Sequence, residues 1–367
     1  MVKCILIASV LGTSIILSAC SDRRIIEEIG FIQSASYDRS ADGQLIIAIS
    51  IPKADSGSKV SREEFLTTAR SAKEARITLS RQSQLTLASG QLRNVLFGCS
   101  LARLGIWEHI DSLVRDTVIS PQVRITLVDG DAAKLLTRQY KQHPIPGRYI
   151  EQLLEKSSRN QTVPKVTLHD FVKEYYEEGI DPVAPIIRDK GDHVEIGGIG
   201  LFRDDRYVAS LHPEEALIFA FLRGKFNQGE IIMDLGSRNG IKETAMLSAI
   251  NSKRRITVNF DQGVPTVYCH ARIQGSIMEY NGTLKISDIH GRHQLETQIA
   301  QNVTERANKM IRLMQNNGVD SLGIGRFVRN SMSYSGWKSL DWMAKYPEVK
   351  VIVNVSVFIK DVGKLKI

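Results

Sequence analysis

The last third of the chain has the clearest alternation of hydrophobic and polar positions. Apolar side chains occupy every second position in three segments, 256–260, 267–273 and 349–359. A period of two is typical of strands with one buried face, and the polar residues between them suit a second face in water. Apolar residues in 295–314 repeat at helical spacing instead, and Gly318 ends that segment. The pattern predicts an antiparallel sheet covered by a long helix.

The first part of the chain alternates shorter segments of strand and helix character. Two β-rich runs, 29–37 and 44–51, predict a hairpin. The further expected elements are a helix at 62–73, a strand at 75–79, a strand at 95–98, a helix at 101–114, a strand at 123–128 and a helix at 132–140. A strand-helix-strand-helix order predicts parallel strands joined by a right-handed crossover.

A break rich in proline and glycine at 143–147 is expected to close a first domain. Beyond it we predict helices at 149–156 and 167–178, the second capped by Thr167, then a hairpin at 199–210 and a helix that starts near Pro213. The expected fold class is therefore α/β and α+β, with three mixed domains. Their predicted ranges are 20–147, 148–226 and 227–367, after a cleaved segment at 1–19.

The first twenty residues have a pattern of their own. Lys3 precedes a charge-free apolar run at 5–17, and the small residue Ala19 precedes Cys20. This order is typical of a signal peptide, and the run is shorter than the ~20 residues that a membrane-spanning helix needs. The Leu-Ser-Ala-Cys ending resembles the bacterial lipobox, which implies cleavage between Ala19 and Cys20 and S-diacylglycerol and N-palmitoyl groups on Cys20. An ordinary secretory signal and an apolar N-terminal helix are the alternatives.

Charge and cysteine usage narrow the class of protein. The full chain has a formal net charge of +8, which becomes +7 when Lys3, the one charged residue of 1–19, is removed. A basic balance suits a position beside anionic lipid. It also fits nucleic acid, but acids are interspersed among the cations and an exported chain seldom meets nucleic acid, so we expect no such partner. Cys99 and Cys269 remain once Cys4 is cleaved off and Cys20 is lipidated, and their spacing indicates neither a disulfide framework nor a zinc site.

Three short motifs bear on chemistry without defining a site. Gly98-Cys99-Ser100 lies between a strand and a helix, as a nucleophile elbow does, but the second glycine of that motif is missing. Asp129-Gly130-Asp131 at a strand end fits either a cation site or a turn followed by a helix cap. His290 and His293 lie three apart near a helix start, without the further ligands that a metal requires.

Glycine-rich and acidic segments give no site either. Gly197-Gly198-Ile199-Gly200 lacks the spacing of a dinucleotide fingerprint and precedes a strand. The adjacent pairs Glu177-Glu178 and Glu214-Glu215 are expected to face solvent. We therefore predict no catalytic residue, no cofactor and no metal.

Several segments, taken in order, resemble the Ger(x)C family of spore germination lipoproteins. Cys20-Ser21-Asp22-Arg23-Arg24 is similar to the family's lipidated Cys-Trp-Asp-Arg-Arg start, with Ser21 in place of tryptophan. The other matching segments are 98–105, 113–116, 131–136, 198–206, 214–225 and 346–359. The resemblance spans nearly the whole mature chain.

The resemblance implies the C subunit of a spore germinant receptor. Such a protein lies at the outer face of the inner spore membrane, held by membrane lipid through Cys20 and assembled with multispanning A and B subunits. It implies an assembly and signal-coupling role without known catalysis, and a fold of three mixed α/β domains. The competing hypothesis is a lipid-anchored solute-binding protein or envelope enzyme, which requires a deep pocket lined by polar groups. Exposed residues of the C-terminal sheet are the expected contact face.

Overall fold

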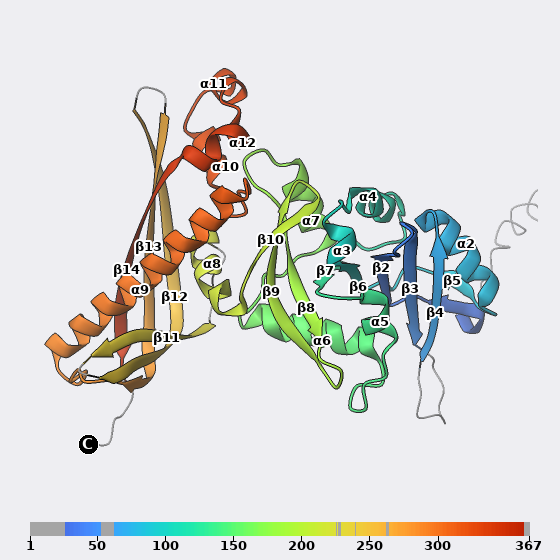
Figure 1. Ribbon diagram of the computed structural model, residues 1–367, viewed down its shortest axis with the longest axis horizontal. Coiled ribbons are helices and arrows are strands. Elements are labelled where there is room, and N and C mark those ends of the chain that lie inside the picture. Colours follow the sequence, from blue (N-terminus) through green and yellow to red (C-terminus); the bar gives the residue numbers. More distant parts are fainter. Residues whose placement is uncertain are drawn as a thin grey trace, which may run out of the picture.

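The computed structural model describes residues 26–52, 62–224, 226, 229–238, 240–261 and 264–362. Two sheets organise the described chain (Figure 1). The larger sheet carries helices on both faces, and the smaller one lies at the other end of the molecule with the long helix α9 (Ile289–Asn316) across it. The mixed fold class predicted from the sequence is confirmed.

The larger sheet has eight strands and combines parallel and antiparallel pairs. In sheet order they are β10 (Arg206–Leu211), β9 (Val194–Arg203), β8 (Val183–Asp189), β7 (Arg124–Val128), β6 (Asn94–Gly98), β2 (Ser34–Arg39), β3 (Leu45–Pro52) and β4 (Arg62–Ala69). The central pairs β2–β6, β6–β7 and β7–β8 are parallel, and both flanks are antiparallel. Strands from both sides of residue 147 thus share one sheet, so the predicted boundary there falls between strands of a single layer.

Every residue of β6 and β7 is buried, because helices cover both faces of the sheet. One face packs against α2 (Ala72–Gln82), α3 (Cys99–Ala102), α4 (Trp107–Arg115) and α7 (Leu168–Tyr176), and the other against α5 (Ala132–Thr137) and α6 (Pro146–Arg159). Neighbouring residues of β6 point to opposite faces, so Phe97 packs with the first set of helices and Leu96 with the second. The predicted Thr167 cap is confirmed: Thr167 and Asp170 form a capping box at the start of α7.

The predictions for 62–79 were wrong in both elements. Residues Arg62–Ala69 form the edge strand β4, antiparallel to β3, and α2 follows it. Helix α2 starts after Ser71, whose side chain accepts the Glu74 N–H, and it buries Ala75 and Leu79 at the i, i+4 spacing of a helix. Segment 62–73 has many good helix formers, but pairing with the buried β3 outweighs that weak local preference.

The smaller sheet has the strand order β11 (Gly229–Arg238), β12 (Ile241–Asp261), β13 (Val264–Asn281) and β14 (Lys350–Asp361). The predicted sheet and covering helix are confirmed, with α9 packed against β14 and β11. One pairing differs from the prediction, since β14 runs parallel to β13. A parallel pair needs a long crossover, and α9, α10 (Ile324–Asn330), α11 (Tyr334–Ser339), α12 (Trp342–Lys345) and η3 (Tyr346–Glu348) supply it.

Short elements complete the described chain. The 3-10 turn η1 (Ile26–Glu28) leads into β1 (Ile29–Phe31), which pairs in parallel with β5 (Thr86–Ala88). The 3-10 turn η2 (Pro213–Glu215) and α8 (Ala216–Arg223) connect the two sheets. Among the described residues, no helix combines the length and the apolar character needed to cross a bilayer.

Candidate functional site

The predicted lipidation and cleavage residues, Cys20 and Ala19, lie outside the described residues. The description begins at Ile26, in η1 immediately before β1. Six peptide links separate Cys20 from Ile26, which allows a reach of about 20 Å at full extension. A lipid on Cys20 would therefore hold the two-stranded β1–β5 sheet close to a bilayer.

Cys99 is placed at the start of α3, directly after β6, where the sequence suggested an elbow. Its thiol is buried, and desolvation raises its pKa to about 12, with a further contribution from the nearby Asp129 carboxylate. At neutral pH such a thiol stays protonated and is a poor nucleophile. A side chain at Gly98 would collide with the carboxylate of Asp38, so glycine is needed there for close packing.

Asp129 and Asp131 lie at the carboxyl end of β7 and have separate structural partners. Asp129 pairs with Arg188 at 2.7 Å, and the Asp131 side chain accepts the Lys134 N–H at 2.7 Å as the cap of α5. The turn-and-cap alternative therefore accounts for both residues. Within the described ranges, no cluster of three or more His, Cys, Asp or Glu side chains is placed to hold a metal ion.

Sequence patterning missed Asp38, a buried carboxylate of β2 that lies beside Gly98 and the start of α5. Asp38 accepts the N–H groups of Ala132 at 3.1 Å and Ala133 at 2.7 Å, so it ties β2 to the start of α5. Burial raises its pKa to about 6, although both of these hydrogen bonds oppose that shift. An aspartate that ends a run of buried strand residues was the available signal.

The histidine and glycine motifs have ordinary positions. His290 and His293 are exposed in the first turn of α9, with His293 Nδ1 3.3 Å from Glu296. Residues 197–200 lie inside β9, where Gly198 has φ +127° and packs against the Leu211 carbonyl. Glu215 accepts the His212 N–H at 2.9 Å and so stabilises the start of η2.

Glu177 and Glu178 do not simply face solvent, contrary to the prediction. Glu178 accepts a hydrogen bond from the Trp337 indole Nε1 at 2.6 Å and forms an ion pair with Lys338. Glu177 lies 3.6 Å from Arg326 and 3.7 Å from Arg329. Both glutamates thus join the end of α7 to the helices that precede β14, a long-range contact that charge patterning could not show.

The same joint contains two buried aspartates. Asp320, fully buried, accepts the N–H groups of Ile324 at 2.8 Å and Gly325 at 2.6 Å. Asp181 accepts the Asp320 N–H at 2.6 Å. Desolvation raises the pKa of Asp181 to about 7 and that of Asp320 to about 6. Strongly perturbed carboxyl groups mark functional sites in many proteins, but here the backbone partners indicate a structural role in the joint between the two sheets.

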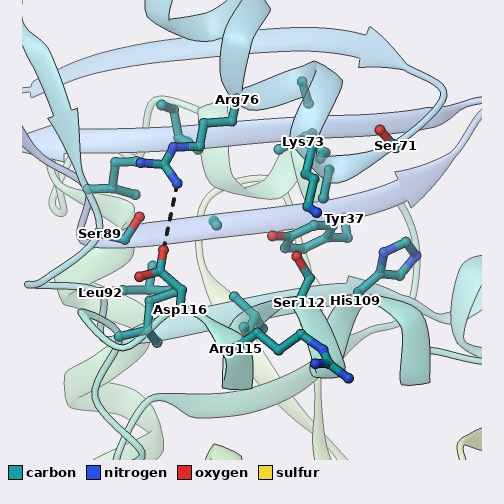
Figure 2. Close-up of a pocket in the computed structure, with 18 of the residues that line it drawn as sticks. Tyr37, Ser71, Lys73, Arg76, Ser89, Leu92, His109, Ser112, Arg115 and Asp116 are labelled. Carbon is teal, nitrogen blue, oxygen red and sulfur yellow. Dashed lines mark ion pairs between the residues drawn. The ribbon is translucent and has the colours of Figure 1, made fainter.

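A hollow on one face of the larger sheet lies between α2 and α4 (Figure 2). It has a volume of about 760 Å³, within the range of small-ligand sites. Apolar side chains form its floor, and Tyr37 of β2 stacks on the His109 ring at 5.4 Å between centroids. Burial raises the pKa of Tyr37 to about 12 and lowers the pKa of His109, so both are neutral at pH 7.

Polar and charged groups surround the mouth of this cavity. Figure 2 shows Lys73 from α2 and Ser112 from α4 directed into it, while Arg76 pairs with Asp116 across one side at 3.8 Å. An ammonium and a hydroxyl above an apolar floor could hold a small molecule with an apolar body and a polar or anionic end. Sequence patterning missed this hollow because its two walls are helices far apart in the chain.

Two domain families match nearly the whole chain. Residues 22–189 match the spore germination protein N-terminal domain, and residues 197–363 match the family described as spore germination B3/GerAC like, C-terminal. The chain belongs to the Ger(x)C family of spore germination proteins. The resemblance drawn from its sequence segments is therefore confirmed, and the division between the two matched ranges falls between β8 and β9 of one sheet.

Relatives of this Ger(x)C protein match over almost their full lengths. Spore germination protein GerQC of Bacillus cereus is 23% identical over 351 residues, covering 95% of this chain and 96% of the relative. The putative spore germination protein YfkR of Bacillus subtilis (strain 168) is 24% identical over 376 residues, covering 96% and 94%. The crystal structure of the GerBC protein matches with a TM-score of 0.56 and 17% identity, over 92% of this chain and 100% of that chain. This structural match supports the fold.

Proposed function

We propose that this Ger(x)C protein is the lipid-anchored C subunit of a spore germinant receptor. Cys20 holds it at the outer face of the inner spore membrane, where it assembles with multispanning A and B subunits. Its role is to couple and organise the assembly without catalysis.

One observation carries this proposal. The family match begins at residue 22, two positions after the cysteine of the lipobox-like sequence, and continues to residue 363. A spore germination domain thus follows the proposed anchor directly, with only a short tether to β1. Two acyl chains bind a bilayer stably, whereas a single chain binds only reversibly.

The non-catalytic role is supported by the structural duties of the reactive side chains. Cys99 is a buried thiol with a raised pKa, Asp129 is paired with Arg188, and Asp131 caps a helix. The buried carboxylates Asp38 and Asp320 accept backbone N–H groups. Each of these residues therefore has a structural role, as a packed thiol, an ion-pair partner or a hydrogen-bond acceptor, that accounts for its position.

Gene deletion and a lipidation variant test the proposal. Deleting the gene is expected to slow or abolish germination in response to at least one nutrient while vegetative growth stays normal. Cys20→Ala is expected to weaken membrane attachment, so that a high-salt wash releases the variant from the spore membrane fraction and leaves the unmodified protein there. Cys99→Ala, at a buried thiol, should leave the distribution unchanged. Normal germination in response to every nutrient tested would contradict the receptor role.

The cavity between α2 and α4 supports a second candidate function, the binding of a small solute by this chain itself. Its volume and its polar mouth over an apolar floor are the observations that favour it. Calorimetric titration with amino acids and sugars should then show saturable binding. Ser112→Trp, which would fill the cavity, should abolish that binding, and Ser335→Trp on the exposed α11 should not. Absence of saturable binding would exclude these solute classes.

A further inference from the structure

One face of the smaller sheet has none of the described helices over it. Helices α8, α9 and α10 pack on the opposite face, where Val267, Cys269 and Ile273 are buried. We call the uncovered side the cationic face. Its cross-strand rows on β12, β13 and β14 are Asn251–Gln274–Phe358, Lys253–Arg272–Ser356, Arg255–His270–Asn354, Thr257–Tyr268–Ile352 and Asn259–Thr266–Lys350.

Positive charge on this face is concentrated in these five rows. None of them contains a carboxylate; the carboxylates of this face lie in the rows beyond, Asp261 at one end and Glu230 and Asp361 at the other. Lys253, Arg255 and Arg272 are exposed, and none forms an ion pair with any described residue. The surface therefore presents several free cations together.

The register places like charges directly opposite one another. Lys253 on β12 is paired with Arg272 on β13. Directly opposed like charges destabilise a sheet, because their side chains leave the backbone only about 5 Å apart. The fold itself gains nothing from this pair, and an anionic partner outside the chain would remove the repulsion.

A hollow of about 580 Å³ opens on this face. Lys253 and Arg272 line it together with Asn251, Gln274 and Ser356, all of which can donate hydrogen bonds, and with Phe358, whose side chain is 53% exposed. Tyr268 and Ile352 lie half-buried on the same face. Cations beside exposed aromatic and aliphatic groups are the composition of surfaces that meet lipid headgroups.

We propose that the cationic face binds the phosphate headgroups of an anionic lipid bilayer. From Asn251 to Asn259 the rows extend about 27 Å along the strands and across three of them. A broad array of cations suits many laterally mobile phosphates, whereas an acidic peptide would follow a groove or a sheet edge. The inference rests on described residues and does not require the lipid proposed at Cys20.

If both attachments exist, they lie far apart in the molecule. Strand β5, with which β1 pairs, is at one end, and the smaller sheet is at the other (Figure 1). One acyl anchor combined with a polybasic surface is a known route to stable membrane binding.

Vesicle sedimentation of the unlipidated chain from Ser21 to Ile367 tests the proposal, because this chain keeps every described residue and lacks Cys20. We expect binding to vesicles of phosphatidylcholine with phosphatidylglycerol, little binding to phosphatidylcholine alone, and loss of binding as salt increases. Each basic residue contributes about fivefold to membrane partitioning, so the combined variant Lys253→Gln, Arg255→Gln and Arg272→Gln should bind about 100-fold more weakly.

A matched variant controls for net charge. Lys285→Gln, Lys309→Gln and Arg312→Gln remove three exposed cations from α9 and the turn before it, away from the cationic face. This variant should keep most of the binding. The cationic-face variant should melt at the same temperature as the unmodified chain or higher, since it loses the like-charge contact between Lys253 and Arg272.

Three outcomes would overturn the inference. Equal binding to neutral and anionic vesicles would show that anionic headgroups are not recognised. Equal loss of vesicle binding in the two triple variants would show that the cationic face has no special role. Absence of vesicle binding, together with loss of the A or B subunit from membrane pull-downs of the face variant, would assign the surface to an acidic protein segment instead.

Discussion

Asp181 and Asp320 exchange two hydrogen bonds across the joint between the sheets. The Asp181 carboxylate accepts the Asp320 N–H at 2.6 Å, and the Asp320 carbonyl accepts the Asp181 N–H at 3.1 Å. One residue precedes β8 and the other follows α9, so the two bonds join segments far apart in the chain. Both carboxyl groups are buried, so the stability that this joint contributes depends on pH.

This pair makes stability depend on pH in a defined direction. In the unfolded chain both carboxyl groups ionise near pH 4, whereas burial raises the pKa of Asp181 to about 7 and of Asp320 to about 6. Between these values the folded chain holds more protons than the unfolded chain, so the stability from this pair falls as pH rises from about 4 to about 7.

Asp181→Asn should remove part of that dependence. Asparagine carries no charge at any pH, so we expect the free energy of unfolding of the unmodified chain to fall, relative to that of the variant, as pH rises from about 4 to about 7. Urea unfolding at several pH values measures it. Asp261→Asn, at an exposed position, is the control and should give a constant difference; an equal fall relative to this control would refute the assignment.

Gly179 is the point of closest approach in the same joint. Its φ is +85°, and a Cβ there would lie 2.5 Å from the carbonyl carbon of Gly325 and 2.6 Å from the Arg326 nitrogen. We expect Gly179→Ala to lower the free energy of unfolding by about 3 kcal/mol, through backbone strain and overlap combined.

Gly240→Ala separates these two causes. Gly240 has φ +78°, and a Cβ added there would meet nothing within 4 Å, so only backbone strain of about 1 kcal/mol is expected. Denaturant unfolding of both variants gives the comparison. Similar losses in the two proteins would mean that close packing against Gly325 contributes little.

Glu174 and Arg223 form an ion pair whose side chains are 9% and 5% exposed, between α7 and α8. Arg223→Met leaves the glutamate buried without its partner, and we expect a loss of about 3–5 kcal/mol in unfolding free energy. Adding Glu174→Leu should restore most of it. Arg115→Met, which breaks an exposed pair with Asp111, should cost less than about 1 kcal/mol. A double variant as unstable as the single one would contradict the account.

The two thiols in the described part of the chain, Cys99 and Cys269, should be unreactive in the folded protein. Burial raises the pKa of Cys99 to about 12 and that of Cys269 to about 11. We therefore expect slow labelling by a thiol reagent at pH 8 and rapid labelling of both in urea. Mass spectrometry of the labelled chain assigns the sites. Fast labelling of native Cys99 would revive the nucleophile-elbow hypothesis.

Local signals in the sequence predicted many elements well. Alternation at 267–273 and 349–359 identified β13 and β14, and helical spacing at 295–314 identified α9. Thr167 marked the start of α7. These features depend on side-chain period and capping, which act within a few residues and can be recognised along the chain.

The sequence by itself determined the family, the strand and helix periods of the C-terminal region and the lipobox-like start before the matched domains. Only the tertiary structure decided that one sheet crosses residue 147, that Arg62–Ala69 is an edge strand, and that β14 lies parallel to β13. It also placed Asp181 against Asp320 and Lys253 opposite Arg272. Strand partners and buried contacts depend on residues distant in the chain, and their combined burial and hydrogen bonding outweighs local preference.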